Sequence, residues 1–232
     1  EKAHQLQISM LPNRIPDHAS AELGWSMKTA TEVGGDYYDY RISDSGQLTL
    51  VLGDATGHGL QAGTLVTATK SLFQSMKIEE DLAYTVSNMS LSLKSMNLKR
   101  LGMALTLVEI DGYELRYCPA GIPPILIYRA GRNKVEEGET GGLPLGLTKH
   151  NIYKQTKLTL EPGDSLLMMS DGLAERTNEE KEEFGYQRVK DLFHKIAKST
   201  PTEICEKMTE GGDTWAGEKE QDDDVSILAL RI

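Results

Sequence analysis

The sequence contains few cysteines and few basic residues. Its two cysteines, Cys118 and Cys205, show no paired spacing, so we expect free thiols and a cytoplasmic protein. The 25 Lys and Arg residues are outnumbered by 35 Asp and Glu, which gives a formal net charge of −10. A chain without a basic stripe cannot neutralise many phosphates, so we expect no binding to nucleic acid.

Long apolar runs are also missing. No stretch approaches the roughly 18 residues that span a bilayer, and there is no secretory signal, so we expect no membrane contact. The sequence has no internal repeats and no low-complexity linker. Its 39% hydrophobic and 26% charged residues are typical of one globular domain with a real core. The chain starts at Glu1 rather than Met, which favours a piece of a longer protein.

Apolar residues recur with two periods along the chain. Runs typical of strands cover residues 21–27, 36–42, 47–53, 104–110, 113–118, 125–128, 152–160, 165–169 and 225–232. Helical spacing predicts helices over residues 60–76, 82–98 and 189–196, and a fourth that begins at the capping signal Thr200-Pro201-Thr202-Glu203. Hairpin signals such as Asp111-Gly112 dominate. We therefore expect an α+β fold of mostly antiparallel sheets with helices outside.

The first residues are predicted to be separate from the main domain. Ala3, Leu6, Met10 and Leu11 follow helical spacing, and Pro12 then breaks the helix. We expect a linker helix within residues 1–16 and a domain over residues 17–232. At this point the helix is equally well interpreted as a connector or as a helix packed on its own domain.

Aspartates stand beside glycines at three separated points of the chain and form an acidic triplet at a fourth. The segments are Gly34-Gly35-Asp36, Gly53-Asp54-Ala55, Ser170-Asp171-Gly172 and Asp222-Asp223-Asp224, each next to a predicted strand. Asp-Gly pairs also mark ordinary turns, but carboxylates at strand ends can converge when the strands share a sheet. Oxygen ligands without Cys and with almost no His suit hard cations such as Mg²⁺ and Mn²⁺. The pattern therefore favours a metal site able to activate water against a phosphate ester.

Six motifs follow one another along nearly the whole chain. They are Gly34–Asp39, Gly53–Gly59, Ala120–Pro124, Gly142–Gly146, Ser170–Leu173 and Asp222–Ser226. In this order they resemble the bacterial stress-response and sporulation branch of the metal-dependent PP2C-type (PPM) serine/threonine phosphatases. The resemblance implies an α/β/β/α sandwich of two packed, mostly antiparallel sheets flanked by helix pairs. It also implies two ions, Mn²⁺ or Mg²⁺, in a cleft at one edge of the sheets.

The resemblance assigns roles to residues of the first two acidic motifs. Asp54 corresponds to the carboxylate that bridges the two ions. Ala55 corresponds to the residue whose backbone carbonyl helps to hold the first ion. Asp36 corresponds to the carboxylate that meets this ion, usually through a water. His58 is a candidate acid for the leaving oxygen, but it follows Asp54 by four residues instead of the family's two, and a turn role is favoured.

The last two acidic motifs correspond to the second ion. Asp171 and Asp223 resemble its ligands, because Asp223-Asp224-Val225-Ser226 matches the family pattern. Asp224 is the runner-up within the acidic triplet. Gly172, like the glycines near Asp54, would let the backbone approach an ion closely.

The implied activity is hydrolysis of phosphoserine or phosphothreonine on a signalling partner by a metal-activated water. The resemblance makes this partner a phosphorylated STAS-type anti-anti-sigma protein, and adds an upstream sensor in the same chain and a homodimer. Two other functions stay open: a pseudophosphatase that binds a phosphoprotein without hydrolysis, and a phosphatase or phosphodiesterase for small molecules. The intact acidic set argues against the pseudophosphatase.

Other conspicuous residues are predicted to be structural. Tyr37, Tyr38 and Tyr40 are expected to pack within a sheet, and Cys118 to lie in the core. Lys28 is expected to be solvated rather than bound to phosphate.

Overall fold

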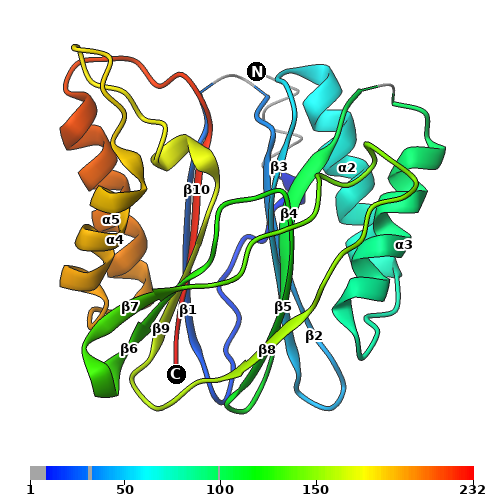
Figure 1. Ribbon diagram of the computed structural model, residues 1–232, viewed down its shortest axis with the longest axis horizontal. Helices are drawn as coiled ribbons and strands as arrows, with labels where there is room; N and C mark the ends of the chain where they lie inside the picture. The colour runs from blue at the N-terminus through cyan, green and yellow to red at the C-terminus, as the bar shows by residue number, and fades with distance from the viewer. Residues whose placement is uncertain (1–8, 31–32, 99) are drawn as a thin grey trace. The chain divides into compact units, whose positions relative to one another are not determined.

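The computed structural model describes residues 9–30, 33–98 and 100–232, and the chain divides into two compact units. Unit 1 comprises residues 1–13, 31–122 and 139–159, and unit 2 comprises residues 14–30, 123–138 and 160–232. Each unit contains one antiparallel sheet of five strands and a pair of long helices (Figure 1). This composition confirms the predicted α+β class.

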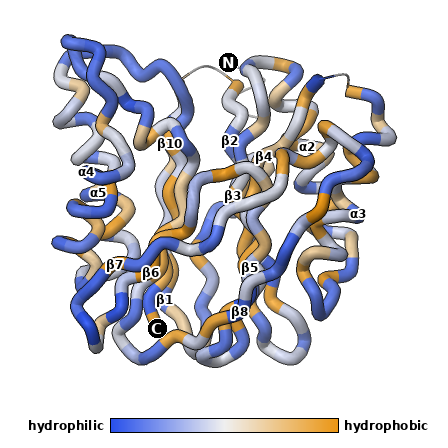
Figure 2. Tube along the Cα trace, in the orientation of Figure 1, coloured by the Kyte–Doolittle hydropathy of each residue, from blue (hydrophilic) through white to orange (hydrophobic). Residues whose placement is uncertain are grey.

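The sheet of unit 1 has the strand order β2-β3-β4-β5-β8. Its strands are β2 Asp36–Ile42, β3 Leu48–Ala55, β4 Met103–Asp111, β5 Glu114–Ala120 and β8 Thr156–Thr159. Between β3 and β4 the chain forms α2 Leu60–Ser75 and α3 Leu82–Ser95, which pack against this sheet. Apolar residues are frequent along the central strands β3 and β4, whereas apolar and polar residues alternate along the helices (Figure 2). The helices therefore bury one stripe against the sheet.

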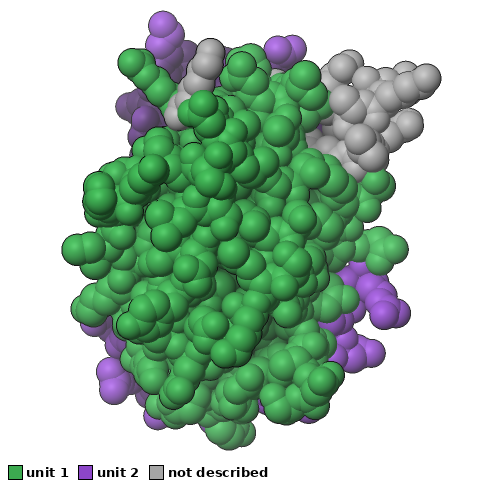
Figure 3. Space-filling view, turned by 90° about the vertical axis from the view of Figure 1, so that its right-hand side faces the viewer, with its two compact units in different colours: residues 1–13, 31–122, 139–159 green, residues 14–30, 123–138, 160–232 purple. Residues whose placement is uncertain are grey.

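The outer sides of α2 and α3 carry several exposed apolar residues. Figure 3 views unit 1, in green, from the side of these helices. Leu60 is 82% exposed, Tyr84 67% and Leu91 48%. Single apolar residues of this kind are ordinary on protein surfaces.

The sheet of unit 2 has the strand order β1-β10-β9-β6-β7. Its strands are β1 Glu22–Lys28, β6 Leu126–Arg129, β7 Lys134–Glu137, β9 Ser165–Met169 and β10 Val225–Arg231. Two single-turn 3₁₀ helices, η1 Ala130–Arg132 and η2 Asp171–Leu173, follow β6 and β9, and the long helices are α4 Gly185–Ile196 and α5 Pro201–Ala216. Helix α5 lies against β1 and β10, and α4 against β6 and β7.

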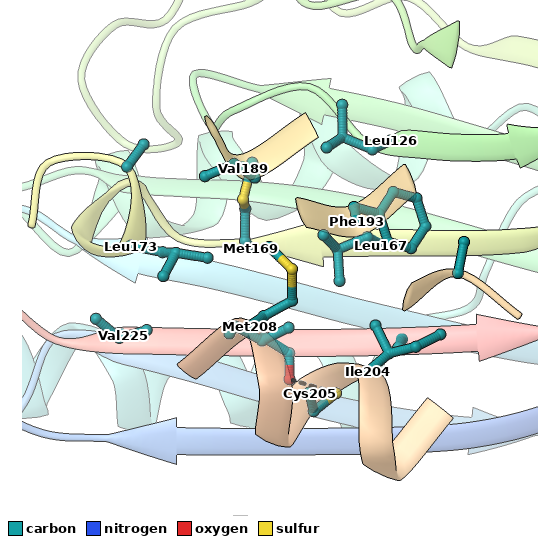
Figure 4. Packing of buried hydrophobic residues seen from close by; sticks show 14 of the residues in the cluster. Leu126, Leu167, Met169, Leu173, Val189, Phe193, Ile204, Cys205, Met208 and Val225 are labelled. Atoms are coloured by element: carbon teal, nitrogen blue, oxygen red, sulfur yellow. Dashed lines mark hydrogen bonds between the residues drawn. The ribbon is translucent and has the colours of Figure 1, made fainter. Parts of the chain in front are cut away.

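The core of unit 2 lies between its helices and its sheet. In Figure 4, Val189 and Phe193 of α4 and Met208 of α5 point toward Leu167 and Met169 of β9. All five side chains are at most 2% exposed. Full burial of such a side chain contributes about 1.5–3 kcal/mol, so this cluster fixes the helices against the strand that carries the Asp171 turn.

Most predicted elements are confirmed, with two differences. The strand predicted over residues 152–160 is shorter: only β8 pairs with β5, and Ile152 is 86% exposed. Strand β7 was not predicted, because Lys134–Glu137 has no apolar alternation and pairs as an edge strand with β6. Residues 1–8 of the predicted linker helix lie outside the described residues, and residues 9–10 are helical.

Candidate metal centre

The two predicted carboxylates of unit 1 face each other across neighbouring strands. Asp36 opens β2, Asp54 lies near the end of β3, and the register pairs them directly. Asp36 is 1% exposed, and Asp54 is partly buried. Directly opposed residues of an antiparallel pair project from the same face of the sheet, where two like charges destabilise the pairing. A bound cation would offset this repulsion.

Gly35 packs closely against this pair of aspartates. A Cβ added to Gly35 would lie 2.7 Å from the carbonyl oxygen of Ala55 and 3.0 Å from Oδ1 of Asp54. The amide of Ala55 donates to the carbonyl of Gly35 at 2.9 Å, which fixes the two segments together. A carboxylate oxygen and a carbonyl oxygen thus converge on one point, and oxygens are the donors that hard divalent cations prefer.

The loop after Asp54 is held by backbone hydrogen bonds on both sides. Thr56 donates its amide to the carbonyl of Gly102 at 2.9 Å, and Gly59 donates to the carbonyl of Val33 at 3.1 Å. Gly59 has a φ of 73° and starts α2 without a side-chain cap. His58 is exposed in this turn. Its position agrees with a structural role in the turn, and its role as a catalytic acid stays a prediction.

In unit 2, the Asp171 turn lies directly against the acidic triplet. A Cβ on Gly172 would lie 2.0 Å from the carbonyl oxygen of Asp224 and 3.5 Å from Cβ of Asp223. Only glycine permits this approach. Ser170 donates its amide to the carbonyl of Ser226 at 3.0 Å and accepts from the amide of Ser226 at 3.0 Å. The residues on both sides of Asp171 therefore contact the acidic triplet or the strand that follows it.

The members of the acidic triplet have different environments. Asp224 is 5% exposed, and its Oδ1 accepts a hydrogen bond from the amide of Ala30 at 2.8 Å. Asp223 lies at the surface, and its Oδ1 accepts from the amide of Asp224 at 2.8 Å. Desolvation, together with the neighbouring charges of Asp171 and Asp224, raises the pKa of Asp223. The two carboxylates thus differ in burial and in their backbone partners, and the choice of Asp223 over Asp224 as an ion ligand stays a prediction.

Two charged residues near Asp171, Glu175 and Arg176, were not predicted from the sequence. Burial, followed by the charges of Asp171 and Glu183, raises the pKa of Glu175. Arg176 is 8% exposed and reaches the loop before the acidic triplet. The available signal was the charged pair Glu175-Arg176, which follows Gly172 after Leu173 and Ala174, but charged residues after a turn are usually solvated.

The predicted ligands divide between the two units. Asp36, Asp54 and Ala55 belong to unit 1, and Asp171 and Asp223 to unit 2. Among the described residues, no group of three or more His, Cys, Asp or Glu side chains is placed to hold a metal ion. Mg²⁺ and Mn²⁺ keep several waters and use few protein carboxylates. The carboxylate and carbonyl oxygens in each unit are the type of ligand that such hard cations prefer.

Several residues predicted to be structural have that role. Tyr37, Tyr38 and Cys118 are buried. Lys28, 44% exposed at its side chain, donates to both carboxylate oxygens of Asp213 at 2.7 Å. It is thus partly solvated and paired with α5.

The glycine-flanked loop Gly142–Gly146 is anchored within unit 1. Leu145 donates its amide to the carbonyl of Met103 at 2.7 Å and accepts from the amide of Met103 at 3.0 Å. Gly142 and Gly146 have φ angles of 70° and 82°, which glycine adopts without strain. The loop is therefore part of the framework around β4.

None of the helices in the described part of the chain combines the length and the apolar character needed to cross a membrane.

Comparison with known proteins gives matches over most of the chain. A family model described as "Stage II sporulation protein E (SpoIIE)" matches residues 44–232. Among curated proteins, the phosphoserine phosphatase RsbU of Bacillus subtilis is 27% identical over 186 residues, which cover 75% of this chain and 53% of RsbU. The chain spans about half or less of the length of the curated relatives it matches.

Solved structures match over nearly the whole chain. The SiaA-PP2C domain of Pseudomonas aeruginosa aligns with a TM-score of 0.86 and 23% identity, covering 100% of this chain and 94% of that one. RsbX, solved in complex with magnesium, aligns with a TM-score of 0.70 and 16% identity, covering 94% and 98% of the two chains. These similarities show the PP2C fold and confirm the predicted fold class. With the family model matching well over half of its residues, the chain belongs to the SpoIIE family of PP2C-type phosphatase domains.

Proposed function

We propose that this chain is the phosphatase domain of a bacterial signalling protein, and that it hydrolyses phosphoserine or phosphothreonine in a divalent-metal-dependent reaction. One observation carries the proposal: Asp36 and Asp54 are directly opposed, with Oδ1 of Asp54 and the carbonyl oxygen of Ala55 both packed closely against Gly35. A divalent cation would offset the repulsion between these two carboxylates. Membership of the family and the phosphoserine phosphatase activity named for RsbU support the reaction class.

The residues of each unit have separate tasks in this proposal. Asp54, the Ala55 carbonyl and Asp36 would hold an ion in unit 1, and Asp171 and Asp223 would hold one in unit 2. When bound, Mn²⁺ or Mg²⁺ supplies Lewis-acid chemistry that activates water and stabilises the charge of the phosphoryl transition state. That Asp54 bridges both ions stays a prediction from the family resemblance.

The scaffold keeps the ligand side chains in place. Pairing of β2 with β3 holds Asp36 opposite Asp54, and the hydrogen bond from Asp224 to Asp223 orients the Asp223 carboxylate. Neither cysteine suits a nucleophilic role: burial raises the pKa of Cys118 and of Cys205 to about 12, so almost no thiolate exists near neutral pH.

The partner we propose is a phosphorylated STAS-domain protein, and the setting is cytoplasmic signalling. The relatives that the chain matches are at least about twice as long as the matched part, which supports an additional sensor region in the same protein. A homodimer is part of the same proposal.

The decisive experiment measures phosphate release from a panel of phosphorylated STAS proteins and from p-nitrophenyl phosphate, with Mn²⁺ or EDTA. Asp54→Asn is the test variant. Asp44→Asn is the matched control, because Asp44 is exposed in the turn at the other end of β2 and β3. Mn²⁺-dependent release from a phosphoprotein that Asp54→Asn loses and Asp44→Asn keeps supports the proposal. Release from p-nitrophenyl phosphate alone indicates a small-molecule phosphatase, and phosphoprotein binding without release indicates a pseudophosphatase.

A further inference from the structure

Arg176 is a buried arginine in the segment that follows the Asp171 turn. It is 8% exposed. One terminal nitrogen of its guanidinium donates to the carbonyl of Glu220 at 2.9 Å, and the other donates to the carbonyl of Lys219 at 3.0 Å. Both carbonyls belong to the loop over residues 217–224, which ends in the acidic triplet. A single side chain therefore joins the segment after Asp171 to the loop that carries Asp223.

A second contact joins the same two segments at the surface. The Lys219 ammonium donates to Oδ2 of Asp222 at 2.8 Å and also to Oγ1 of Thr177. Thr177 directly follows Arg176 and donates to Oδ2 of Asp222 at 3.4 Å. The two segments are thus joined twice, by the Arg176 guanidinium and by the contacts among Lys219, Thr177 and Asp222.

Helix α5 supports the guanidinium from behind. Oδ1 of Asp213 lies 3.6 Å from a terminal nitrogen of Arg176. Gly212 of the same helix lies close to Leu173 and Arg176, since a Cβ there would lie 2.9 Å from Cδ1 of Leu173 and at an ordinary contact distance of 4.0 Å from Cγ of Arg176. A buried charge is tolerated only when it is paired and hydrogen-bonded. The two carbonyls satisfy the terminal nitrogens and the Asp213 carboxylate offsets the charge, whereas Nε of Arg176 is buried without a hydrogen-bond partner among the described residues.

We propose that Arg176 is a positioning residue: it sets the placement of Asp223 relative to Asp171 by holding the loop over residues 217–224. The inference rests on the proposed metal-dependent function, because these two carboxylates are the predicted ligands in unit 2. Arg176 acts through the loop backbone and does not touch either carboxylate. Its planar fork suits this task, because lysine would offer one nitrogen and could not hold both carbonyls in the same geometry.

Removing Arg176 should weaken ion binding without changing the catalytic step itself. Groups that orient metal ligands typically change metal affinity on the order of 10- to 100-fold when removed. We expect Arg176→Ala to raise the Mn²⁺ dissociation constant by this factor, and turnover to recover as Mn²⁺ is increased. Arg176→Lys keeps the buried charge and should give an intermediate affinity.

The test titrates Mn²⁺ into the whole chain by isothermal titration calorimetry, at a temperature where circular dichroism shows each variant folded. The matched control is Arg231→Ala. Arg231 also donates to a backbone carbonyl, that of Lys198 at 3.0 Å, but it ends β10 on the side away from the triplet. Turnover of p-nitrophenyl phosphate over a range of Mn²⁺ concentrations and thermal unfolding in EDTA complete the comparison.

Weaker Mn²⁺ binding in folded Arg176→Ala, with wild-type affinity in Arg231→Ala, supports the inference. Unchanged affinity in folded Arg176→Ala overturns it and assigns Arg176 a role in stability alone. If Arg176→Ala does not fold, Arg176→Lys decides: intermediate affinity supports the inference, and wild-type affinity overturns it. Wild-type protein that binds no Mn²⁺ overturns the metal centre itself, and this inference with it.

Discussion

Asp54 is the single residue whose charge has the clearest consequence. Replacing it with Asn keeps the shape of the side chain but removes one charge from the pair with Asp36. We expect activity to fall by about two orders of magnitude or more, as when a main electrostatic contributor is removed. In EDTA the thermal midpoint should rise, because repulsion across β2 and β3 is relieved. Steady-state turnover and thermal unfolding measure the two effects, and near-wild-type turnover at saturating Mn²⁺ would refute the assignment.

Replacing the predicted ligands of unit 2 by Asn should also lower turnover. Asp171→Asn and Asp223→Asn each remove a charge from the pair brought together by Gly172. We expect a comparable loss of turnover with folding retained. Full activity in either variant would remove that residue from the predicted ligand set.

The two cysteines allow a test of whether hydrolysis needs a thiol nucleophile. Their thiols are buried, and burial raises the pKa of each to about 12, so neither is a nucleophile near neutral pH. Cys118→Ser and Cys205→Ser should stay active, activity should vanish with EDTA, and Mn²⁺ or Mg²⁺ should restore it. Hydrolysis that persists in EDTA and depends on a thiol would show a different mechanism.

At the scale of elements, two 3₁₀ turns of unit 2 provide a matched pair of glycines. Gly172 is the middle residue of η2, and a Cβ there would meet the Asp224 carbonyl oxygen at 2.0 Å. Gly131 is the middle residue of η1, where a Cβ would meet only Oε2 of Glu161, at an ordinary 3.5 Å. We expect Gly172→Ala to cost about 1–3 kcal/mol of stability through backbone displacement and to weaken Mn²⁺ binding.

Gly131→Ala is the control for this prediction and should leave both properties near wild type. Chemical denaturation gives the free energy of unfolding, and calorimetric titration gives the Mn²⁺ affinity. Equal behaviour of the two variants would show that the approach of the Asp171 turn to Asp224 has no role in ion binding.

Elements with local causes could be predicted from the sequence. The predicted cap of α5 is present: Thr200 accepts from the amide of Glu203 at 3.3 Å and donates its own amide to Oε2 of Glu203 at 2.9 Å. Strand β8 shows the limit, because its length depends on where β5 offers a pairing partner. Only Glu114–Tyr117 pairs with it, so residues 152–155 stay outside the sheet.

The candidate site was predictable to a similar extent. Residue types and motif order pointed to the acidic positions, but the pairing of Asp36 with Asp54 is a matter of strand register. The contact of Gly172 with Asp224 joins positions more than fifty residues apart in the sequence. Arg176 could not be singled out, because its role depends on carbonyls of a distant loop.

At the scale of the whole molecule, the predicted linker helix remains a proposal. Its described end contacts α2: Oγ1 of Thr67 lies 3.6 Å from the sulfur of Met10, and Leu11 is 8% exposed. One turn earlier in α2, a Cβ on Gly63 would lie 2.9 Å from Cγ1 of Val33. Helix α2 therefore touches both the linker and the segment that leads into Asp36.

These contacts support a two-state switch in which the linker biases α2, and through it the affinity for the ion held in unit 1. We expect the isolated chain to be weakly active, and Met10→Asp to change Mn²⁺ affinity, turnover or dimerisation without altering a ligand. Leu91→Asp, at an exposed apolar position of α3, is the matched control and should change none of them. Calorimetric titration, turnover and sedimentation velocity provide the three readouts. If deleting residues 1–11 leaves all three unchanged in both the chain and the full-length protein, the helix is a passive tether and the switch is wrong.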